Sequence, residues 1–263
     1  MLIFIVPLKS AKTATSWERV SQLFYRTVAS ACAQTSPEFR VVVACHEIPT
    51  GEFSNPKLEF VEVTHLPPSP SDPDDMRGDK QRKHLSALTR ALEYSPTHVM
   101  FLDSDDLVSN RLAEFVAGHS TDNGWYMRSG YFFCERQPRL HVERRRFDEW
   151  CGSAHIVRPE HLDLMTRFDD RLIYDHRQLK HGLQQQGTPI RSLPFRGAIY
   201  TISHGDNFND YERIFWPAHP LWHPLRRMIH HRAITPRIRK EFGLYSMGTG
   251  PPPGPDLSRE WED

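Results

Sequence analysis

The chain has 263 residues, and its 33 lysines and arginines balance 33 aspartates and glutamates, so its formal charge is zero. A neutral chain lacks the overall basic character expected of a general nucleic-acid-binding protein. The hydrophobic fraction of 38% is too high for a disordered chain and too low for a protein with several membrane spans. The length allows one large α/β domain or two small ones, each with a real core.

The sequence favours a cytoplasmic location. The apolar run at residues 2–8 has no preceding basic region and no cleavage site, and it is far shorter than the roughly 20 residues that span a bilayer. The four cysteines are scattered without a CxxC pair, which predicts buried thiols and not a zinc or redox centre. They are Cys32, Cys45, Cys134 and Cys151.

Short apolar runs alternate with segments of helical periodicity in the first hundred residues, a pattern typical of α/β proteins. The runs predict strands at residues 2–6, 39–45, 58–63 and 98–102. The periodic segments predict helices at residues 17–31 and 79–94. A stretch rich in Pro, Ser and Asp predicts a surface loop at residues 65–75.

The second half of the chain has a more mixed pattern. Residues 125–134 predict a strand, and residues 159–168 and 175–186 predict short helices. Residues 219–240 are rich in His, Arg, Trp and Pro, which suits peripheral contact with an anionic membrane or a packed C-terminal subdomain. The Gly/Pro-rich residues 248–255 predict a mobile tail.

An acidic motif directly follows the fourth predicted strand: Asp103, Ser104, Asp105 and Asp106. Three carboxylates so close together repel one another unless a cation or solvent neutralises them. Such carboxylates bind hard divalent ions, and ligands of open α/β sheets bind at the carboxyl ends of strands. The alternative is a solvated acidic turn in which Asp106 or Ser109 caps a helix that begins near Asn110.

The motif and four other segments, taken in order, resemble the GT-A glycosyltransferases, in particular the family 2-like group. The other segments are residues 3–7, residues 78–83, Cys151-Gly152-Ser153 and residues 204–207. The resemblance covers about residues 1–210. It implies an α/β fold with a Rossmann-like, mixed but mainly parallel sheet flanked by helices, followed by a C-terminal helical or irregular extension. Residues 1–115 then form the nucleotide-sugar (donor) half, residues 116–215 the acceptor half of the same domain, and residues 216–263 the basic extension.

The resemblance implies a donor site at the ends of the first strands. Pro7 and Leu8 are expected beside the nucleotide base, and Glu47 is the counterpart of an acidic residue that the family usually presents to the base. Lys80 and Lys83 match a basic helix that meets the nucleotide or its diphosphate, where ammonium groups offset phosphate charge. A solvated helix face is the alternative for both lysines.

The resemblance also implies a Mn²⁺ or Mg²⁺ ion. Asp103 is expected to face the ribose or the water shell of the metal, and Asp105 and His204 are expected to bind it. Asp106 is expected to hold a sugar hydroxyl or to orient its neighbours. The ion acts as a Lewis acid on the departing nucleoside diphosphate.

An inverting transferase needs a carboxylate that removes a proton from the acceptor hydroxyl. Asp175 matches the position of this base in the family, and its alternative role is the N-cap of the helix that follows. Asp148 and Glu149 are rival bases. Gly152 and Ser153 are expected to approach the donor or acceptor sugar closely, because glycine permits contact by the backbone.

These expectations describe a glycosyltransferase, and a hexosyltransferase is the expected type. It moves a sugar from a nucleoside-diphosphate donor, UDP being the commonest in the family, to a saccharide, lipid-linked or other hydroxyl acceptor. Two alternatives stay open. One is a non-catalytic nucleotide-sugar or carbohydrate-binding module, and the other is a haloacid-dehalogenase-type phosphatase. The pair Asp169 and Asp170 favours the phosphatase, whereas Leu107 and the late position of the motif do not.

Overall fold

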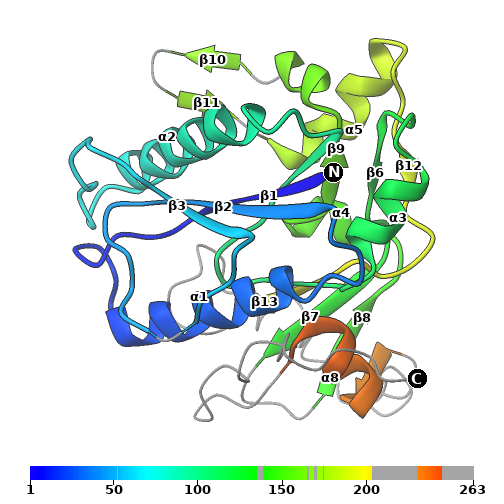
Figure 1. The fold of residues 1–263 in the computed structure, drawn as a ribbon, viewed down its shortest axis with the longest axis horizontal. Helices are drawn as coiled ribbons and strands as arrows, with labels where there is room; N and C mark the ends of the chain where they lie inside the picture. Colours follow the sequence, from blue (N-terminus) through cyan, green and yellow to red (C-terminus); the bar gives the residue numbers. More distant parts are fainter. Residues whose placement is uncertain are drawn as a thin grey trace, which may run out of the picture.

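The computed structural model describes residues 1–51, 53–134, 139–164, 166–168, 171–173, 175–202 and 230–244. Helices cover both faces of a central sheet, with α1 (Trp17–Cys32) on one face and α2 (Pro73–Leu92) on the other (Figure 1). The predicted fold class, a mainly parallel α/β sheet flanked by helices, is confirmed.

The central sheet has the strand order β12-β6-β9-β4-β1-β2-β3. Its strands are β1 (Leu2–Pro7), β2 (Phe39–Cys45), β3 (Leu58–Glu62), β4 (His98–Phe101), β6 (Gly124–Tyr126), β9 (His155–Val157) and β12 (Arg191–Ser192). Strand β1 pairs in parallel with β2 and β4, and β2 pairs in parallel with β3, while β9 runs antiparallel to both neighbours. The carboxyl ends of β1 to β4 therefore meet at one edge of the sheet.

Strand β1 is buried on both faces, as its unbroken apolar run predicts. Phe4 packs in the same cluster as Val20 and Phe24 of α1. Ile5, on the opposite face of the strand, packs with Leu88 of α2. The period of two along the strand thus joins the two helices to one sheet.

A second sheet has the order β14-β8-β7-β13-β5. Its strands are β5 (Leu107–Val108), β7 (Gly130–Cys134), β8 (Arg139–Glu143), β13 (Ala198–Ile202) and β14 (His231–Ala233). Strand β5 directly follows the acidic motif and pairs antiparallel with β13. The motif therefore lies where the chain passes from the first sheet to the second.

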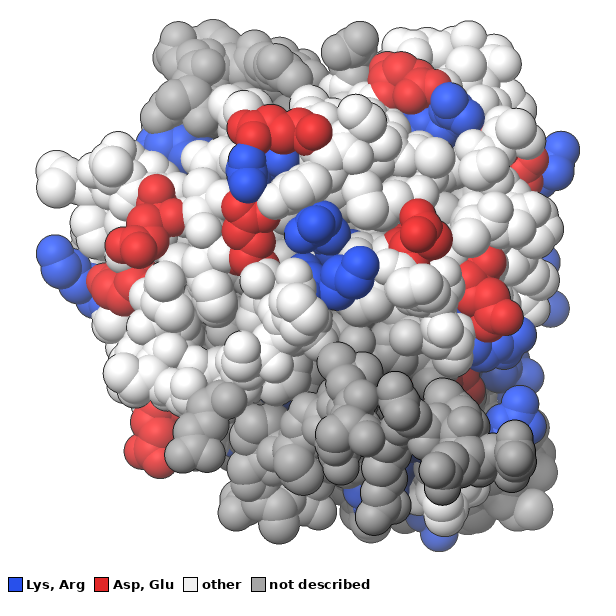
Figure 2. All heavy atoms as spheres, in the orientation of Figure 1, with Lys and Arg blue, Asp and Glu red and all other residues white. Residues whose placement is uncertain are grey.

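The remaining described elements are short, apart from one helix. They are α3 (Leu112–Gly118), α4 (Phe147–Trp150), the 3₁₀ helix η1 (Pro159–Leu164), the hairpin β10 (Thr166–Phe168) and β11 (Arg171–Ile173), α5 (His176–Gln185) and α8 (Pro236–Phe242). None of the described helices is long and apolar enough to cross a membrane. In the view of Figure 2, basic and acidic side chains are interspersed over the part of the surface that is described, in keeping with the balanced charge.

Three predictions of secondary structure are wrong in detail. Helix α2 begins at Pro73 and not at Asp79, because Asp72 caps it and accepts hydrogen bonds from Asp74 N (2.9 Å) and Asp75 N (3.3 Å). An Asp followed by Pro is a helix start, although the surrounding composition indicates a loop. The predicted surface loop is correspondingly shorter.

The single strand predicted at residues 125–134 is two strands, β6 and β7, which belong to different sheets. The helix predicted at residues 159–168 is the 3₁₀ helix η1 followed by strand β10. In both places the pairing partner decides the element, and a local pattern does not contain that partner.

The described part of the C-terminal extension, residues 230–244, packs on the second sheet. Phe242 and Leu244 are buried in a cluster with Tyr131 and Leu140. Strand β14 pairs antiparallel with β8. This segment is packed against the second sheet, which agrees with the packed alternative for this part of the extension, and residues 203–229 and 245–263 lie outside the described residues.

Candidate active site

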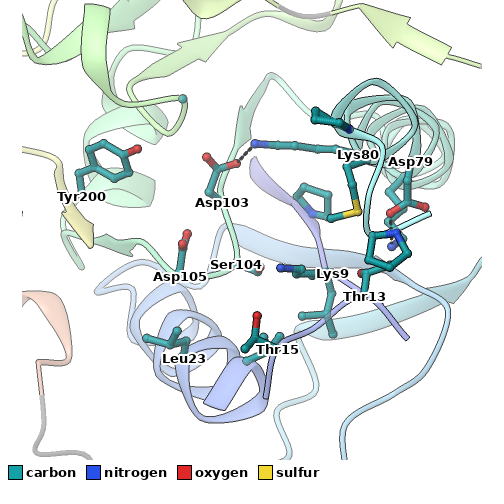
Figure 3. A pocket seen from close by; sticks show the side chains of 18 of the residues that line it. Lys9, Thr13, Thr15, Leu23, Asp79, Lys80, Asp103, Ser104, Asp105 and Tyr200 are labelled. Carbon is teal, nitrogen blue, oxygen red and sulfur yellow. Dashed lines mark hydrogen bonds and ion pairs between the residues drawn. The ribbon is translucent and has the colours of Figure 1, made fainter. Parts of the chain in front are cut away.

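A cavity of about 580 Å³ lies at the carboxyl ends of β1 and β4 (Figure 3). It is lined by eight of the residues that the sequence singles out: Pro7, Leu8, Lys80, Lys83, Asp103, Ser104, Asp105 and Gly152. They come from four separate segments of the chain, and the parallel topology brings them together at the edge of the sheet. The acidic motif therefore borders a cavity.

The Asp103 carboxylate faces the Lys80 ammonium across the cavity wall, with 2.6 Å between Oδ1 and Nζ (Figure 3). Burial acts to raise the pKa of Asp103, but the charge and hydrogen bond of Lys80 hold that pKa below its ordinary value. Burial likewise acts to lower the pKa of Lys80, and Asp103 raises it overall. Both groups are therefore charged at neutral pH, and helix α2 is tied to the motif.

Asp106 is fully buried and does not line the cavity. Its Oδ2 accepts hydrogen bonds from Ser153 Oγ (2.7 Å) and Cys151 Sγ (3.4 Å), and its Oδ1 accepts one from Thr201 N (3.0 Å). Burial, followed by the charges of Asp105 and Asp103, raises the pKa of Asp106 well above its ordinary value. Of the two roles expected for Asp106, the geometry supports orienting neighbours and not holding a sugar hydroxyl.

Of Gly152 and Ser153, which are both expected to approach a sugar closely, only Gly152 lines the cavity. A Cβ at the position of Gly152 would lie 3.1 Å from Asp103 Oδ2, so glycine allows the close approach of the two segments. Ser153 is fully buried behind the wall, where its hydroxyl accepts a hydrogen bond from Asp103 N (2.9 Å). The structure does not place Ser153 against a sugar.

Lys83 lines the cavity and belongs to a largely buried polar cluster on its wall. Its Nζ lies 2.7 Å from Asp79 Oδ2, and its side chain is 1% exposed. The other Asp79 oxygen accepts a hydrogen bond from His65 Nε2 (2.9 Å), and His46 Nε2 donates to His65 O (2.9 Å). Burial lowers the pKa of Lys83 and is opposed by the Asp79 carboxylate.

The ligand atoms of His46, His65 and Asp79 lie within 4.8 Å of one another, a spacing that suits a metal ion. However, the Lys83 ammonium already supplies a buried positive charge to Asp79. A second cation at this place would meet that charge in a poorly solvated site. The cluster is therefore a hydrogen-bonded ion pair that joins α2 to the loops after β2 and β3.

Glu47 does not line the cavity. Both of its carboxylate oxygens accept a hydrogen bond from Ser10 Oγ (3.1 Å each), and Oε2 also accepts one from Ala11 N (3.2 Å). Glu47 thus holds the loop after β1, which carries Leu8 and Lys9 on the cavity wall. The contact with a base that the resemblance implies stays a prediction.

All three candidate bases, Asp148, Glu149 and Asp175, are engaged in ion pairs. Asp148 is buried in α4, and its Oδ2 lies 2.6 Å from Lys180 Nζ. Glu149 pairs at the surface with Arg146 (2.5 Å), whose hydrogen bond lowers the pKa of Glu149. Neither carboxylate lines the cavity.

Asp175 is the N-cap of α5, with Oδ1 accepting from Arg177 N at 3.0 Å. Burial acts to raise the pKa of Asp175, and the hydrogen bonds and charge of Arg177 lower it overall. The next residue, His176, lines the cavity and donates from Nε2 to Glu149 O (3.3 Å). The capping role is thus present, and the role as base stays a prediction.

The donor set suits a hard divalent ion, since Asp103 and Asp105 both present carboxylates to the cavity. Lys80 holds one oxygen of Asp103, so an ion would share that carboxylate with the ammonium or displace it. His204, the third predicted ligand, lies outside the described residues, as do Asp169 and Asp170.

Several residues on the wall were not predicted from the sequence: Lys9, Thr13, Thr15, Met76, Asp79, Trp150, His176 and Tyr200. Lys9 follows the first strand by two positions, so a basic residue at a strand end was a usable signal. Tyr200 and Trp150 carry no such signal. In Figure 3, Tyr200 lies on the opposite side of Asp103 from Lys80.

No protein-family model and no curated protein sequence matches the chain. Among solved structures, S. aureus TarS resembles it with 15% identity and a TM-score of 0.47, over 77% of this chain and 37% of TarS. The structure of S. aureus TarS 1-349 in complex with UDP has 15% sequence identity to this chain and a TM-score of 0.45. The match covers 77% of this chain and 60% of that one. A putative nucleotide-diphospho-sugar transferase from Desulfovibrio desulfuricans has 12% sequence identity and a TM-score of 0.33, and the match covers 77% of this chain and 80% of that one. This chain thus spans less than two thirds of TarS, and at these values the likeness carries no conclusion about activity.

Proposed function

We propose that this protein is a glycosyltransferase that moves a sugar from a nucleoside-diphosphate donor to a hydroxyl acceptor. One observation carries the proposal: Lys80, Asp103 and Asp105 line one cavity at the carboxyl ends of parallel strands. Ammonium groups complement a diphosphate, and paired carboxylates complement the cation that accompanies it. The site therefore has the charges that a nucleotide sugar requires.

Within this proposal, residues 1–115 bind the donor. Pro7 and Leu8 offer an apolar surface to the base, and Lys9 and Lys80 offset phosphate charge. Residues 116–215 bind the acceptor, and Gly152, His176 and Tyr200 form that side of the cavity. UDP is the proposed nucleotide.

Asp103 and Asp105 would hold Mn²⁺ or Mg²⁺, together with His204 as the predicted third ligand. When bound, the ion supplies a Lewis acid that offsets the negative charge gained by the departing nucleoside diphosphate. Lys80 also offsets the negative charge of the departing nucleoside diphosphate. Its pKa is raised beside Asp103, so it remains an ammonium at neutral pH.

Asp175 is the proposed base that takes the proton of the acceptor hydroxyl, and the transfer then inverts the anomeric centre. Asp148 and Glu149 are the rival bases; like them, Asp175 is paired with a basic residue and does not itself line the cavity. Asp175 immediately precedes His176 on the cavity wall, so an acceptor held there lies near the start of α5.

The proposal is tested by thermal unfolding with UDP, uridine and UDP-sugars, each with and without Mn²⁺. A ligand stabilises the native chain only if it binds to it, so UDP with Mn²⁺ should raise the melting temperature more than either alone. Uridine, which lacks the diphosphate, should give little effect. If no nucleoside diphosphate changes the melting temperature in the presence of Mn²⁺, the proposal is wrong.

A second measurement separates an enzyme from a binding module. Donor hydrolysis and transfer are followed with Mn²⁺ and a panel of saccharide and lipid-linked acceptors. We expect turnover of at least one donor. Nucleotide-sugar binding without hydrolysis or transfer would favour a non-catalytic module.

A further inference from the structure

A chain of buried hydrogen bonds runs behind the acidic motif. Asp103 N donates to Ser153 Oγ (2.9 Å), and Ser153 Oγ donates to Asp106 Oδ2 (2.7 Å). Thr201 N donates to the other oxygen of Asp106 (3.0 Å). Ser153, Asp106 and Thr201 are all fully buried, so water does not compete for these bonds.

The hydrogen bonds join three segments that are far apart in the sequence. These are the turn after β4, the loop after α4, and strand β13. In each segment the buried anchor stands next to a residue on the cavity wall: Asp105 beside Asp106, Gly152 beside Ser153, and Tyr200 beside Thr201. The position of each wall residue is thus set by a neighbour that never reaches the cavity.

A buried carboxylate close to two others is costly, and a packed apolar side chain would join the same segments without that cost. Hydrogen bonds add what apolar packing lacks, namely a defined direction and distance between groups. The Ser153 hydroxyl makes two hydrogen bonds: it accepts one from the backbone N–H of Asp103 and donates one to the Asp106 carboxylate. It therefore connects the backbone at the start of the motif to the carboxylate at its end.

We propose that Ser153 and Asp106 are positioning residues that hold Asp103 and Asp105 in the arrangement needed to bind a divalent ion and a diphosphate. The inference rests on the proposed function. Neither residue touches the ligand. Groups that orient metal ligands from behind are needed for full metal affinity, although they do not bind the ion themselves.

The test replaces Ser153 by alanine and by cysteine, and uses Ser30→Ala as the matched control. Ser30 is 1% exposed, and its hydroxyl also both donates (Val108 O, 2.9 Å) and accepts (Val108 N, 3.0 Å). It anchors the segment directly after the motif but does not line the cavity. Ser30→Ala therefore removes an equivalent pair of buried bonds.

The measurement is the Mn²⁺ concentration that gives half of the stabilisation by UDP, taken relative to the melting temperature of each variant without ligand. Ser153→Ala should raise this concentration about tenfold. Ser153→Cys, nearly the same size and a weak donor and acceptor, should fall between wild type and Ser153→Ala. Ser30→Ala should lower the melting temperature without changing the Mn²⁺ concentration.

Equal Mn²⁺ dependence in Ser153→Ala and Ser30→Ala would overturn the inference while leaving the proposed function intact. If Ser153→Ala does not fold, a wild-type Mn²⁺ dependence in Ser153→Cys overturns it equally. A wild-type chain whose UDP binding is indifferent to Mn²⁺ contradicts metal dependence in the proposed function, and this inference fails with it.

Discussion

Lys80 Nζ lies 2.6 Å from Asp103 Oδ1, so an ion pair on the cavity wall joins helix α2 to the turn after β4. Both residues belong to the donor site that the sequence predicts. Their pairing means that a diphosphate, or the cation that accompanies it, must share or replace an existing partner. The affinity for the donor therefore depends on both Lys80 and Asp103.

Replacing Lys80 by methionine removes the ammonium while keeping a long apolar side chain. We expect the dissociation constant for UDP to rise about tenfold, since hydrogen bonds to charged groups contribute about 1.5 to 3 kcal/mol. Isothermal titration calorimetry measures the change. Lys12→Met is the control, because Lys12 is exposed in the loop after β1 and does not line the cavity. Equal loss of affinity in both variants would contradict a specific role for Lys80.

Asp105→Asn should abolish transfer without destabilising the fold. Burial, and then the charge of Asp105, raises the pKa of Asp106, so removing that charge relieves repulsion within the motif. We expect a melting temperature at or above that of the wild type and a loss of transfer of about a hundredfold or more. Asp74→Asn, at a side chain that is 83% exposed, should leave both unchanged. Wild-type turnover in Asp105→Asn would contradict the metal assignment.

The two roles of Asp175 are separable by substitution. Serine caps a helix about as well as aspartate but is not a base, whereas alanine does neither. Asp175→Ser should keep the wild-type stability and nucleotide binding, yet lose transfer by about a hundredfold or more. Asp175→Ala should lose the same activity and also about 1 kcal/mol of stability. If Asp175→Ser retains the wild-type kcat, Asp175 is only a cap, and His176 on the cavity wall becomes the next candidate base.

Lys83 and Asp79 should be coupled in stability. Lys83→Met leaves the Asp79 carboxylate, whose side chain is 7% exposed, without its cation, and we expect a loss of about 3 kcal/mol in urea unfolding. Adding Asp79→Asn should recover part of this loss, because no unpaired charge remains. Arg77→Met, which breaks an exposed pair with Asp74, should cost less than about 1 kcal/mol. Simple additivity of the Lys83 and Asp79 variants would contradict the pairing.

Acid should destabilise the protein through buried histidines. His98 is fully buried, donates to Asp122 O (2.8 Å), and burial lowers its pKa from 6.5 to about 4. The unfolded chain therefore binds a proton between these values and the folded chain does not, so stability falls as the pH drops from 6.5 toward 4. His98→Gln should reduce this slope by about 1.4 kcal/mol per pH unit in denaturant unfolding. His181→Gln, at an exposed position, should leave the slope unchanged.

The local sequence pattern is sufficient to predict those features that depend only on neighbouring residues. The unbroken apolar run of β1 predicts a strand buried on both faces, and the acidic motif after β4 predicts a ligand site at the strand ends. Where pairing decides, local pattern was not enough. Residues 125–134 read as one strand, yet they divide between two sheets.

The sequence by itself determined the layered α/β architecture and the segments that supply the cavity wall, because apolar periodicity and the charge of a motif are properties of neighbouring residues. Only the tertiary structure decided which polar side chains reach the cavity and which stay behind it. Ser153 and Asp106 are 47 positions apart, and their hydrogen bond exists because two sheets meet at the motif. Burial and direction are set by the packing of distant segments, and no local pattern contains them.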